Sequence, residues 1–403
     1  MSEPSTIDTR SELLQLLAEA AELEHGIACS YLYAAFSLKR DIAEGGMDWM
    51  EQQKVRRWAA QIYFVASQEM LHLALVWNLT TAIGGTPSYF RPNFPQDTSY
   101  YPIGAPIALE PFGRHSLRRF ILYEHPQSVE RAPDLKSLLS FEGEDAQDFP
   151  FGSVGELYRL IRSGFGAIDE RELFIGAPSQ QMTPDLVHFP DLVAVVDRAS
   201  AMRAIDEIVH QGEGAGSDRD DSHFGAFVAM LQEHLQTRSQ GSGFAPARPA
   251  MRNPCARTVR GYGAAASPIE DPRAQEVAAL FDSTYSLMLR MLAWSFAFDS
   301  NGAEAQLESF CGVAIDLMPR VLLPLGEGLM LMPAGPSYPG KTAGPGFGLT
   351  RSLTLPPDPV TAMRLCRERL LELGGVAAKL VRQPLPDPVT NGCSHLQQIA
   401  AAF

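Results

Sequence analysis

The chain has 403 residues, 45% of them apolar, so it is long enough to bury a large core and to form more than one domain. Its formal net charge of -14 at pH 7 argues against a nucleic-acid partner or an anionic membrane, because both call for a basic patch. We therefore expect a protein that acts on a small molecule.

The N-terminal residues show neither a basic start nor an apolar run, so no signal peptide is predicted. No stretch reaches about 18 apolar residues without a charge or a breaker, so no transmembrane helix is predicted. These two observations predict a cytoplasmic location.

Two long amphipathic helices are predicted first, over residues 8–39 and 48–83. Ionisable residues fall on their apolar stripes, where a carboxylate is normally paired, protonated or bound to a metal. A structural salt bridge of Glu24 to an arginine is the alternative to metal binding. The stripes consist of Leu13, Leu17, Ala20, Glu24, Ala28, Tyr31 and Ala35, and of Ile62, Val65, Glu69, His72, Val76 and Leu79.

A Glu on one helix and a Glu-x-x-His on its neighbour form half of the inward-facing ligand set of a ferritin-like di-iron or di-manganese bundle. Glu24 supplies the first element, and Glu69 with His72 supplies the second. The i, i+3 spacing places Glu69 and His72 on one helix face. These two residues are also the candidate catalytic residues.

The next segment, residues 88–112, is rich in proline and aromatic residues and could wall a substrate pocket. A third helix should begin near Ser153, with Glu156 either in a capping box or as a metal ligand. A fourth helix is predicted over residues 189–211. Two helical pairs separated by a long crossover correspond to the ferritin-like topology.

The sequence does not decide which residues of the fourth helix are metal ligands. Its apolar phase carries forward to Glu213, whereas Glu207 and His210 match the Glu-x-x-His spacing literally. His223 begins a further periodic segment and could reach back to the site, or it could be a solvated helix-start residue. The candidate metal ligands are Glu24, Glu69, His72, Glu156, His210, Glu213 and His223.

The rest of the sequence predicts an irregular linker and then additional helices over residues 274–298, 304–332 and 358–381. We expect a metal-binding bundle in residues 1–235, a linker in 236–272, and helices packed on the bundle in 273–403. The predicted fold class is all-α: a ferritin-like four-helix bundle with additional C-terminal helices and long loops rich in proline and glycine.

Several strings in this order resemble the ferritin-like domain of the iminophenyl-pyruvate dimer synthases, enzymes of bisindole pathways such as violacein, rebeccamycin and staurosporine biosynthesis. The strings are LEHGIACSYLYAAFSLK, QEMLHLALVWNLTTAIGGTP, LEPF, VGELY, LFIG, IVHQGEGAG followed by SHF, and TAGPGF. The resemblance implies an iron enzyme that couples two imines derived from aromatic amino acids. It also implies site roles for Glu24, Glu69, His72, Glu156, Glu213 and His223.

The function that follows is a non-haem di-iron oxidase or oxygenase of secondary metabolism, acting with O2 on a small amino-acid-derived substrate. The expected cofactor is iron, with two ions per chain, and manganese as the alternative metal. A homodimer is compatible with this interpretation. Two alternatives keep the fold: a metal-storage protein, and a metal-free binding or scaffold protein.

Overall fold

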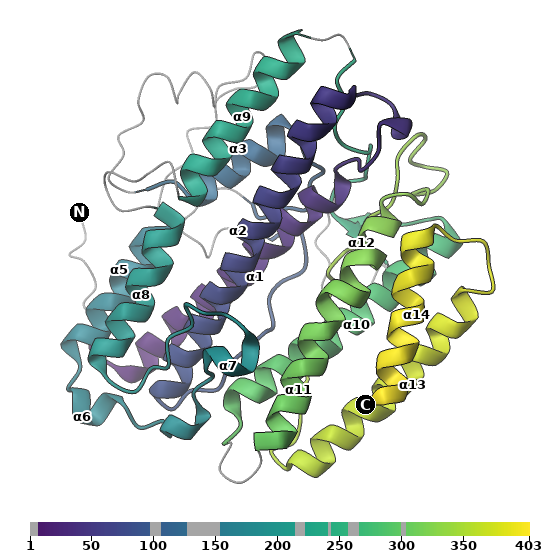
Figure 1. Cartoon of the computed structure of the whole chain (residues 1–403). Helices are drawn as coiled ribbons and strands as arrows, with labels where there is room; N and C mark the ends of the chain where they lie inside the picture. The colour runs from purple at the N-terminus through teal and green to yellow at the C-terminus, as the bar shows by residue number, and fades with distance from the viewer. Residues whose placement is uncertain are drawn as a thin grey trace.

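The structure is a computed structural model that describes residues 7–96, 106–126, 154–213, 222–240, 243–256, 266–299 and 304–403. Regular structure in these ranges is almost entirely helical, which confirms the all-α class. The helices form three layers, with the two longest in the middle (Figure 1).

The middle layer consists of α1 (Arg10–Ser37) and α2 (Trp49–Ala82), which pack against each other along their lengths. A short 3₁₀ helix, η1 (Ile42–Glu44), lies in the connection between them. Both long helices begin at a capping box, in which Thr9 or Asp48 accepts a backbone N–H three residues later. Their bounds lie within two residues of those predicted.

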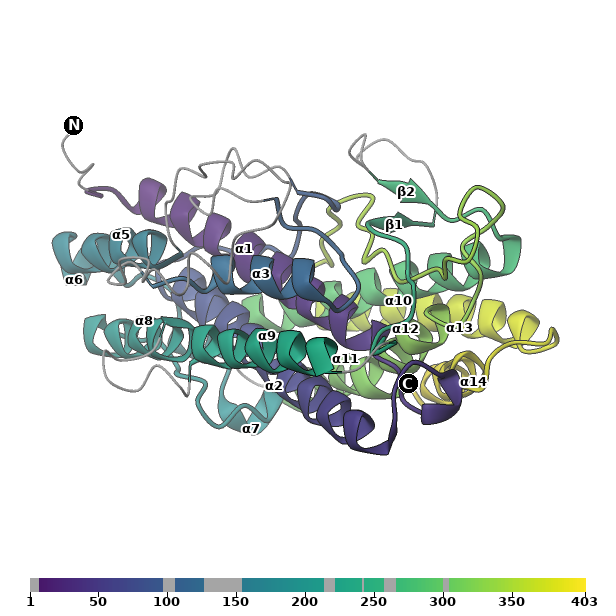
Figure 2. The same cartoon turned by 90° about the horizontal axis from the view of Figure 1, so that it is seen from above.

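The second layer completes the bundle with two helices that are each divided into two pieces. The third consists of α3 (Arg114–Tyr123) and α5 (Val154–Ala167), and the fourth of α8 (Arg198–Glu213) and α9 (His223–Gln240). α3 packs against α9, and α5 packs against α8. Seen from above, the pieces of each helix follow one another along one line (Figure 2). Both divisions therefore fall at the same level of the bundle.

Short elements connect these helices. They are α6 (Glu170–Leu173), the 3₁₀ helix η2 (Pro178–Gln180), α7 (Pro184–Val187), and the parallel strands β1 (Pro254–Cys255) and β2 (Ser267–Pro268).

The third layer covers the other face of α1 and α2, where α10 contacts α2 and α12 contacts α1. By length and composition alone, Glu304–Leu329 could cross a membrane. Its helices instead pack against α10 and α14, as core helices do. The layer consists of α10 (Pro272–Ala297), α11 (Glu304–Leu317), the π-helical turn η4 (Met318–Leu322), α12 (Leu323–Leu329), α13 (Pro359–Leu380) and α14 (Asp387–Ala402).

Three elements differ from the predicted ones. The fourth helix begins at Arg198 and not near residue 189, because Asp197 accepts the backbone N–H of Ser200 at 2.7 Å and starts the helix there. Neither α3, which lies in the predicted long crossover, nor α14 was predicted. The predicted domain boundaries stay a prediction, although α9 runs past residue 235.

Candidate metal centre

The helices α1 and α2 bring three ionisable side chains together in the core. Glu24 lies on α1, Glu69 and His72 lie one turn apart on α2, and none of the three is more than 2% exposed. Nδ1 of His72 is 3.0 Å from Oε2 of Glu69 and 3.6 Å from Oε2 of Glu24. The two apolar stripes therefore face the same interior, and their polar members meet there.

A second group of side chains shares Glu69. Glu124 directly follows α3, and His223 is the first residue of α9. Nδ1 of His223 is 2.9 Å from Oε1 of Glu69 and 3.6 Å from Oε2 of Glu124. Each oxygen of the Glu69 carboxylate thus faces a different histidine, which is the position of a carboxylate able to bridge two metal ions.

One pair of ligand atoms, in the second group, lies close together without a hydrogen bond, as atoms placed for a metal would. Oε1 of Glu69 and Nδ1 of His223 are buried and 2.9 Å apart, yet neither takes part in a hydrogen bond of acceptable geometry. Within each group, the ligand atoms lie within 4.8 Å of one another. Carboxylates and imidazoles suit iron and manganese in four-helix bundles. The ligand cluster, as we name it, consists of Glu24, Glu69, His72, Glu124 and His223.

Burial and neighbouring charges set the protonation of the ligand cluster. Burial, together with the Glu69 carboxylate, raises the pKa of Glu24 to about 8, and the same causes raise the pKa of Glu124. Burial also opposes ionisation of Glu69, but His72 and His223 outweigh it and hold its pKa well below the usual value. Burial lowers the pKa of His223, while Glu69 and Glu124 raise it to about 9. An incoming ion must therefore displace protons.

Two glutamine side chains orient the imidazoles. Nε2 of His72 is 3.1 Å from Oε1 of Gln211, and Nε2 of His223 is 3.0 Å from Oε1 of Gln68. The Gln211 amide donates in turn to Glu207, which fixes the direction of its oxygen. Because each glutamine oxygen accepts from an Nε2–H, a neutral imidazole presents the Nδ1 lone pair to the ligand cluster.

Two phenols hold the outer carboxylates. Tyr158 on α5 donates to Oε1 of Glu24, and Tyr31 on α1 donates to Oε1 of Glu124. All four side chains are buried. Burial and the adjacent carboxylates raise the pKa values of both tyrosines well above the usual value, so the phenols stay protonated and act as donors.

The structure does not bring Glu156 to the ligand cluster. Its side chain is 43% exposed and lies 3.5 Å from Arg159 in a surface ion pair. The helix α5 turns Leu157, Tyr158 and Ile161 inward, so the neighbouring Glu156 faces solvent. Ser153, the predicted cap, lies outside the described residues. The carboxylate expected from the third helix comes from Glu124 instead.

His210 also lies away from the ligand cluster. α8 buries Ala204, Ile205 and Ile208, and this phase leaves His210 exposed. Glu213 ends α8, but its side chain lies outside the part of the chain that the structure describes. Of the histidine alternatives left open by the sequence, the geometry favours His223.

Glu124 is the one member of the ligand cluster that sequence reasoning missed, although a signal was present. Leu117, Phe120, Ile121 and Glu124 follow the i, i+3, i+4, i+7 pattern, and all are buried. The same rule that selects Glu24 would have selected Glu124. The short α3 was hidden because it follows a long segment rich in proline.

A cavity of about 20 Å³ lies beside the ligand cluster. Glu24, Glu69, His72 and Glu124 line it, together with Tyr158 and apolar residues of α8. This volume holds little more than one water-sized particle. The cavity thus leaves room for one small particle beside the buried carboxylates.

Comparison with known proteins places this geometry in a family. A sequence profile described as ferritin-like matches residues 17–232, a span that contains the whole ligand cluster. The chain belongs to the ferritin-like family. The helices α10–α14 of this ferritin-like protein lie outside the matched span.

Two curated relatives agree with the resemblance seen in the sequence strings, which is thereby confirmed. Dichlorochromopyrrolate synthase of Lentzea aerocolonigenes is 29% identical over 432 residues, covering 97% of this chain and 41% of the relative. The 2-imino-3-(indol-3-yl)propanoate dimerase of Chromobacterium violaceum is 29% identical over 381 residues, covering 85% and 34%. The ferritin-like chain thus spans well under half the length of either relative.

A solved structure is also similar. The crystal structure of a ferritin-like protein from Caulobacter vibrioides matches at 20% identity with a TM-score of 0.44, covering 76% of this chain and 95% of that protein.

Proposed function

We propose that this ferritin-like protein is an O2-dependent oxidase with two iron ions held by the ligand cluster. The observation that carries the proposal is the position of Glu69, whose two oxygens lie 3.0 Å from His72 and 2.9 Å from His223. A site for one ion needs one group of ligands, whereas here two groups share a carboxylate. Manganese would suit the same ligands.

The names of the relatives support a reaction class. One is a dimerase of 2-imino-3-(indol-3-yl)propanoate, an aromatic imino acid, and the other is a synthase of dichlorochromopyrrolate. We extend to this chain the oxidative coupling of two aromatic imino acids. Joining one carbon of each molecule, with loss of a hydrogen from both, releases two electrons and two protons, which O2 accepts to give H2O2. When bound, the iron ions would supply the redox chemistry of O2.

The residues of the chain prepare the site for this chemistry. Gln68 and Gln211 keep the Nδ1 atoms of His223 and His72 directed inward. The phenol of Tyr158 holds its proton against Oε1 of Glu24, where a proton can be passed to or taken from the carboxylate. Burial of the ligand cluster excludes bulk water, which strengthens each of these interactions.

The proposal is tested by metal content and by product. Metal-free protein is titrated anaerobically with Fe(II), and about two equivalents per chain should be retained. The loaded protein is then exposed to O2 with an aromatic imino acid generated in situ from L-tryptophan. Mass spectrometry should show a product with twice the mass of the imino acid less two hydrogens.

The controls separate the alternatives. Glu156→Ala serves as the matched variant, because it removes a carboxylate outside the ligand cluster. Iron below about half an equivalent would overturn the two-ion site. Uptake of O2 with continuing accumulation of iron and no coupled product would replace the oxidase by a storage protein.

A further inference from the structure

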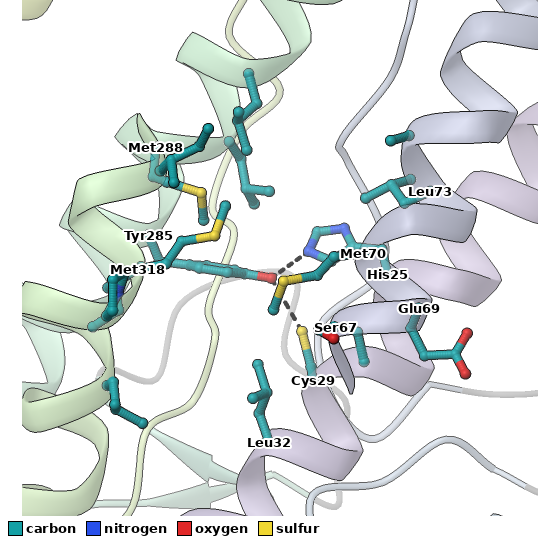
Figure 3. Close-up of a pocket in the computed structure, with 18 of the residues that line it drawn as sticks. His25, Cys29, Leu32, Ser67, Glu69, Met70, Leu73, Tyr285, Met288 and Met318 are labelled. Carbon is teal, nitrogen blue, oxygen red and sulfur yellow. Dashed lines mark hydrogen bonds between the residues drawn. The ribbon is translucent and has the colours of Figure 1, made fainter. Parts of the chain in front are cut away.

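A second and much larger cavity lies on the opposite side of α1 and α2 from the ligand cluster. Its volume is about 440 Å³, and its walls come from α1, α2, α10, η4 and α12. Most of the lining is apolar, including Met70, Met288 and Phe281. Both the size and the lining are those of cavities that take a small organic molecule. Figure 3 shows the side chains converging on it from the two layers.

Three polar groups meet in the wall of this cavity. The Tyr285 hydroxyl, from α10, is 3.0 Å from Sγ of Cys29 and hydrogen bonds with Nε2 of His25, both from α1 (Figure 3). Burial raises the pKa of Tyr285 well above its usual value, so the hydroxyl keeps its proton. When His25 carries its proton on Nε2, it donates to the phenol oxygen. The Tyr285 hydroxyl is then able to donate into the cavity.

A buried positive charge stands behind this polar end. Arg91 is fully buried, and its Nη2 is 3.5 Å from Sγ of Cys29 and 2.8 Å from the carbonyl of Phe347. Its guanidinium lies 4.2 Å from the ring centroid of Phe94. Among the described residues, no carboxylate forms an ion pair with Arg91.

A buried guanidinium that has no ion pair within the described ranges is costly in the core, and its charge acts strongly across the dry surroundings. Carbonyl groups and a ring satisfy the guanidinium only in part, because its Nε has no hydrogen-bond partner. The field of Arg91 therefore favours a negative charge at the Tyr285 end of the cavity. The remainder of the cavity favours an apolar body.

We propose that this cavity binds an organic anion with an aromatic or similarly apolar body and one carboxylate, whose carboxylate accepts from Tyr285 and is attracted by Arg91. The apolar body lies among the methionine and aromatic side chains of α2 and α10. The site contains no member of the ligand cluster except a wall contribution from Glu69. The polar end of the cavity, at Tyr285, His25 and Cys29, lies outside the ligand cluster, so binding needs no metal.

The test compares a matched acid and amide on metal-free protein. Binding of 3-phenylpropanoate and of 3-phenylpropanamide is measured by calorimetry at pH 7. We expect the acid to bind at least about tenfold more tightly, the value of one hydrogen bond to a charged group. Arg91→Met should lower this preference by removing the attraction of the guanidinium, while the amide affinity stays nearly unchanged.

Two further variants keep the test decisive if Arg91→Met does not fold. Tyr285→Phe should weaken the acid about tenfold and leave the amide nearly unchanged. Ala28→Phe, which fills the cavity wall, should abolish binding of both probes. Tyr33→Phe is the matched control, because Tyr33 is a buried phenol that donates to Met251 and does not line the cavity.

Equal affinities for acid and amide in the wild type would overturn the anion site. Wild-type affinity in Tyr285→Phe or in Ala28→Phe would overturn its location. Since every measurement uses metal-free protein, none of these results depends on whether the ligand cluster binds iron.

Discussion

The two faces of the α1–α2 layer carry opposite kinds of site. Toward α5 and α8, a cavity of about 20 Å³ is lined by three carboxylates and one imidazole, together with tyrosine and apolar side chains. Toward α10, a cavity of about 440 Å³ is lined mainly by apolar side chains. Adjacent positions of one helix serve both, since Glu24 faces the first cavity and His25 the second. A helix rotation of about 100° per residue makes this possible.

The difference indicates that the two parts of the chain contribute different kinds of side chain. The family profile covers the face with the ligand cluster, whereas α10, α11, η4 and α12, which close the larger cavity, lie beyond it. The shared ferritin-like part thus supplies ionic ligands, and the additional helices supply apolar volume. Four predictions sharpen or break this contrast.

The largest effect is expected at Glu69. Metal that binds only the folded protein stabilises it by about 4 kcal/mol at a thousandfold excess over Kd. Glu69→Ala removes the shared carboxylate and should abolish this gain for Fe(II), as measured by thermal unfolding with and without the metal. A similar shift in variant and wild type would mean that Glu69 is not a shared ligand.

Variants at Glu124 and Glu156 compare the carboxylate that the structure places at the ligand cluster with the one that the sequence predicted. Glu124→Ala should weaken binding of Fe(II) by at least about a hundredfold, because a buried ligand is lost. Glu156→Ala should change stability by less than about 1 kcal/mol and leave metal affinity unchanged, because its ion pair is exposed. Competitive chelator titration measures the Fe(II) affinity of both variants. A larger loss of affinity in Glu156→Ala than in Glu124→Ala would make Glu156 the ligand.

The pH dependence of metal binding is expected to be next in size. The pKa values of about 8 for Glu24 and about 9 for His223 mean that both hold protons at pH 7 in the metal-free protein. Against the effect of burial, Glu69 and Glu24 also raise the pKa of His72 well above its usual value. An ion must displace these protons, so affinity should rise with pH between 6 and 8, by about tenfold per pH unit for each proton released. Calorimetry in buffers of different ionisation enthalpy counts those protons. An affinity independent of pH between 6 and 8 would contradict the assignment.

The smallest effect tests whether the two faces are independent. Ala28→Phe fills the larger cavity from α1, and Ala28 is not a member of the ligand cluster. We expect its affinity for Fe(II) to stay within about twofold of the wild type, because the substitution removes no ligand. A change above about tenfold in the same chelator titration would show that the two faces do not act separately.

Much of the ligand cluster could be predicted from local pattern. Glu24, Glu69 and His72 stand on long stripes of regular period, and periodicity over many turns is a strong signal. His223 was recognised because it begins a periodic segment. Glu124 was not predicted, because the ten residues of α3 are too few for the helical periodicity to stand out.

The larger cavity could not be predicted, and the reason is separation along the chain. Its polar end joins Tyr285 to His25 and Cys29 across more than 250 residues. No local sequence pattern indicates which face of α10 packs against α1. Sequence reasoning placed a substrate pocket at the aromatic segment after α2, which supplies Arg91 behind the polar end of the cavity but not the aromatic wall that was expected. There, Tyr89 bonds to Leu353 and lines neither cavity, while Tyr100 and Tyr101 lie outside the described residues.

Glu69 contributes to the walls of both cavities. Occupancy of the two sites is therefore linked wherever one occupant displaces this turn of α2. By thermodynamic reciprocity, a factor by which a carboxylate ligand changes the affinity for metal must equal the factor by which metal changes the affinity for that ligand. Through the Glu69 side chain, the affinity of each site would then depend on whether the other site is occupied.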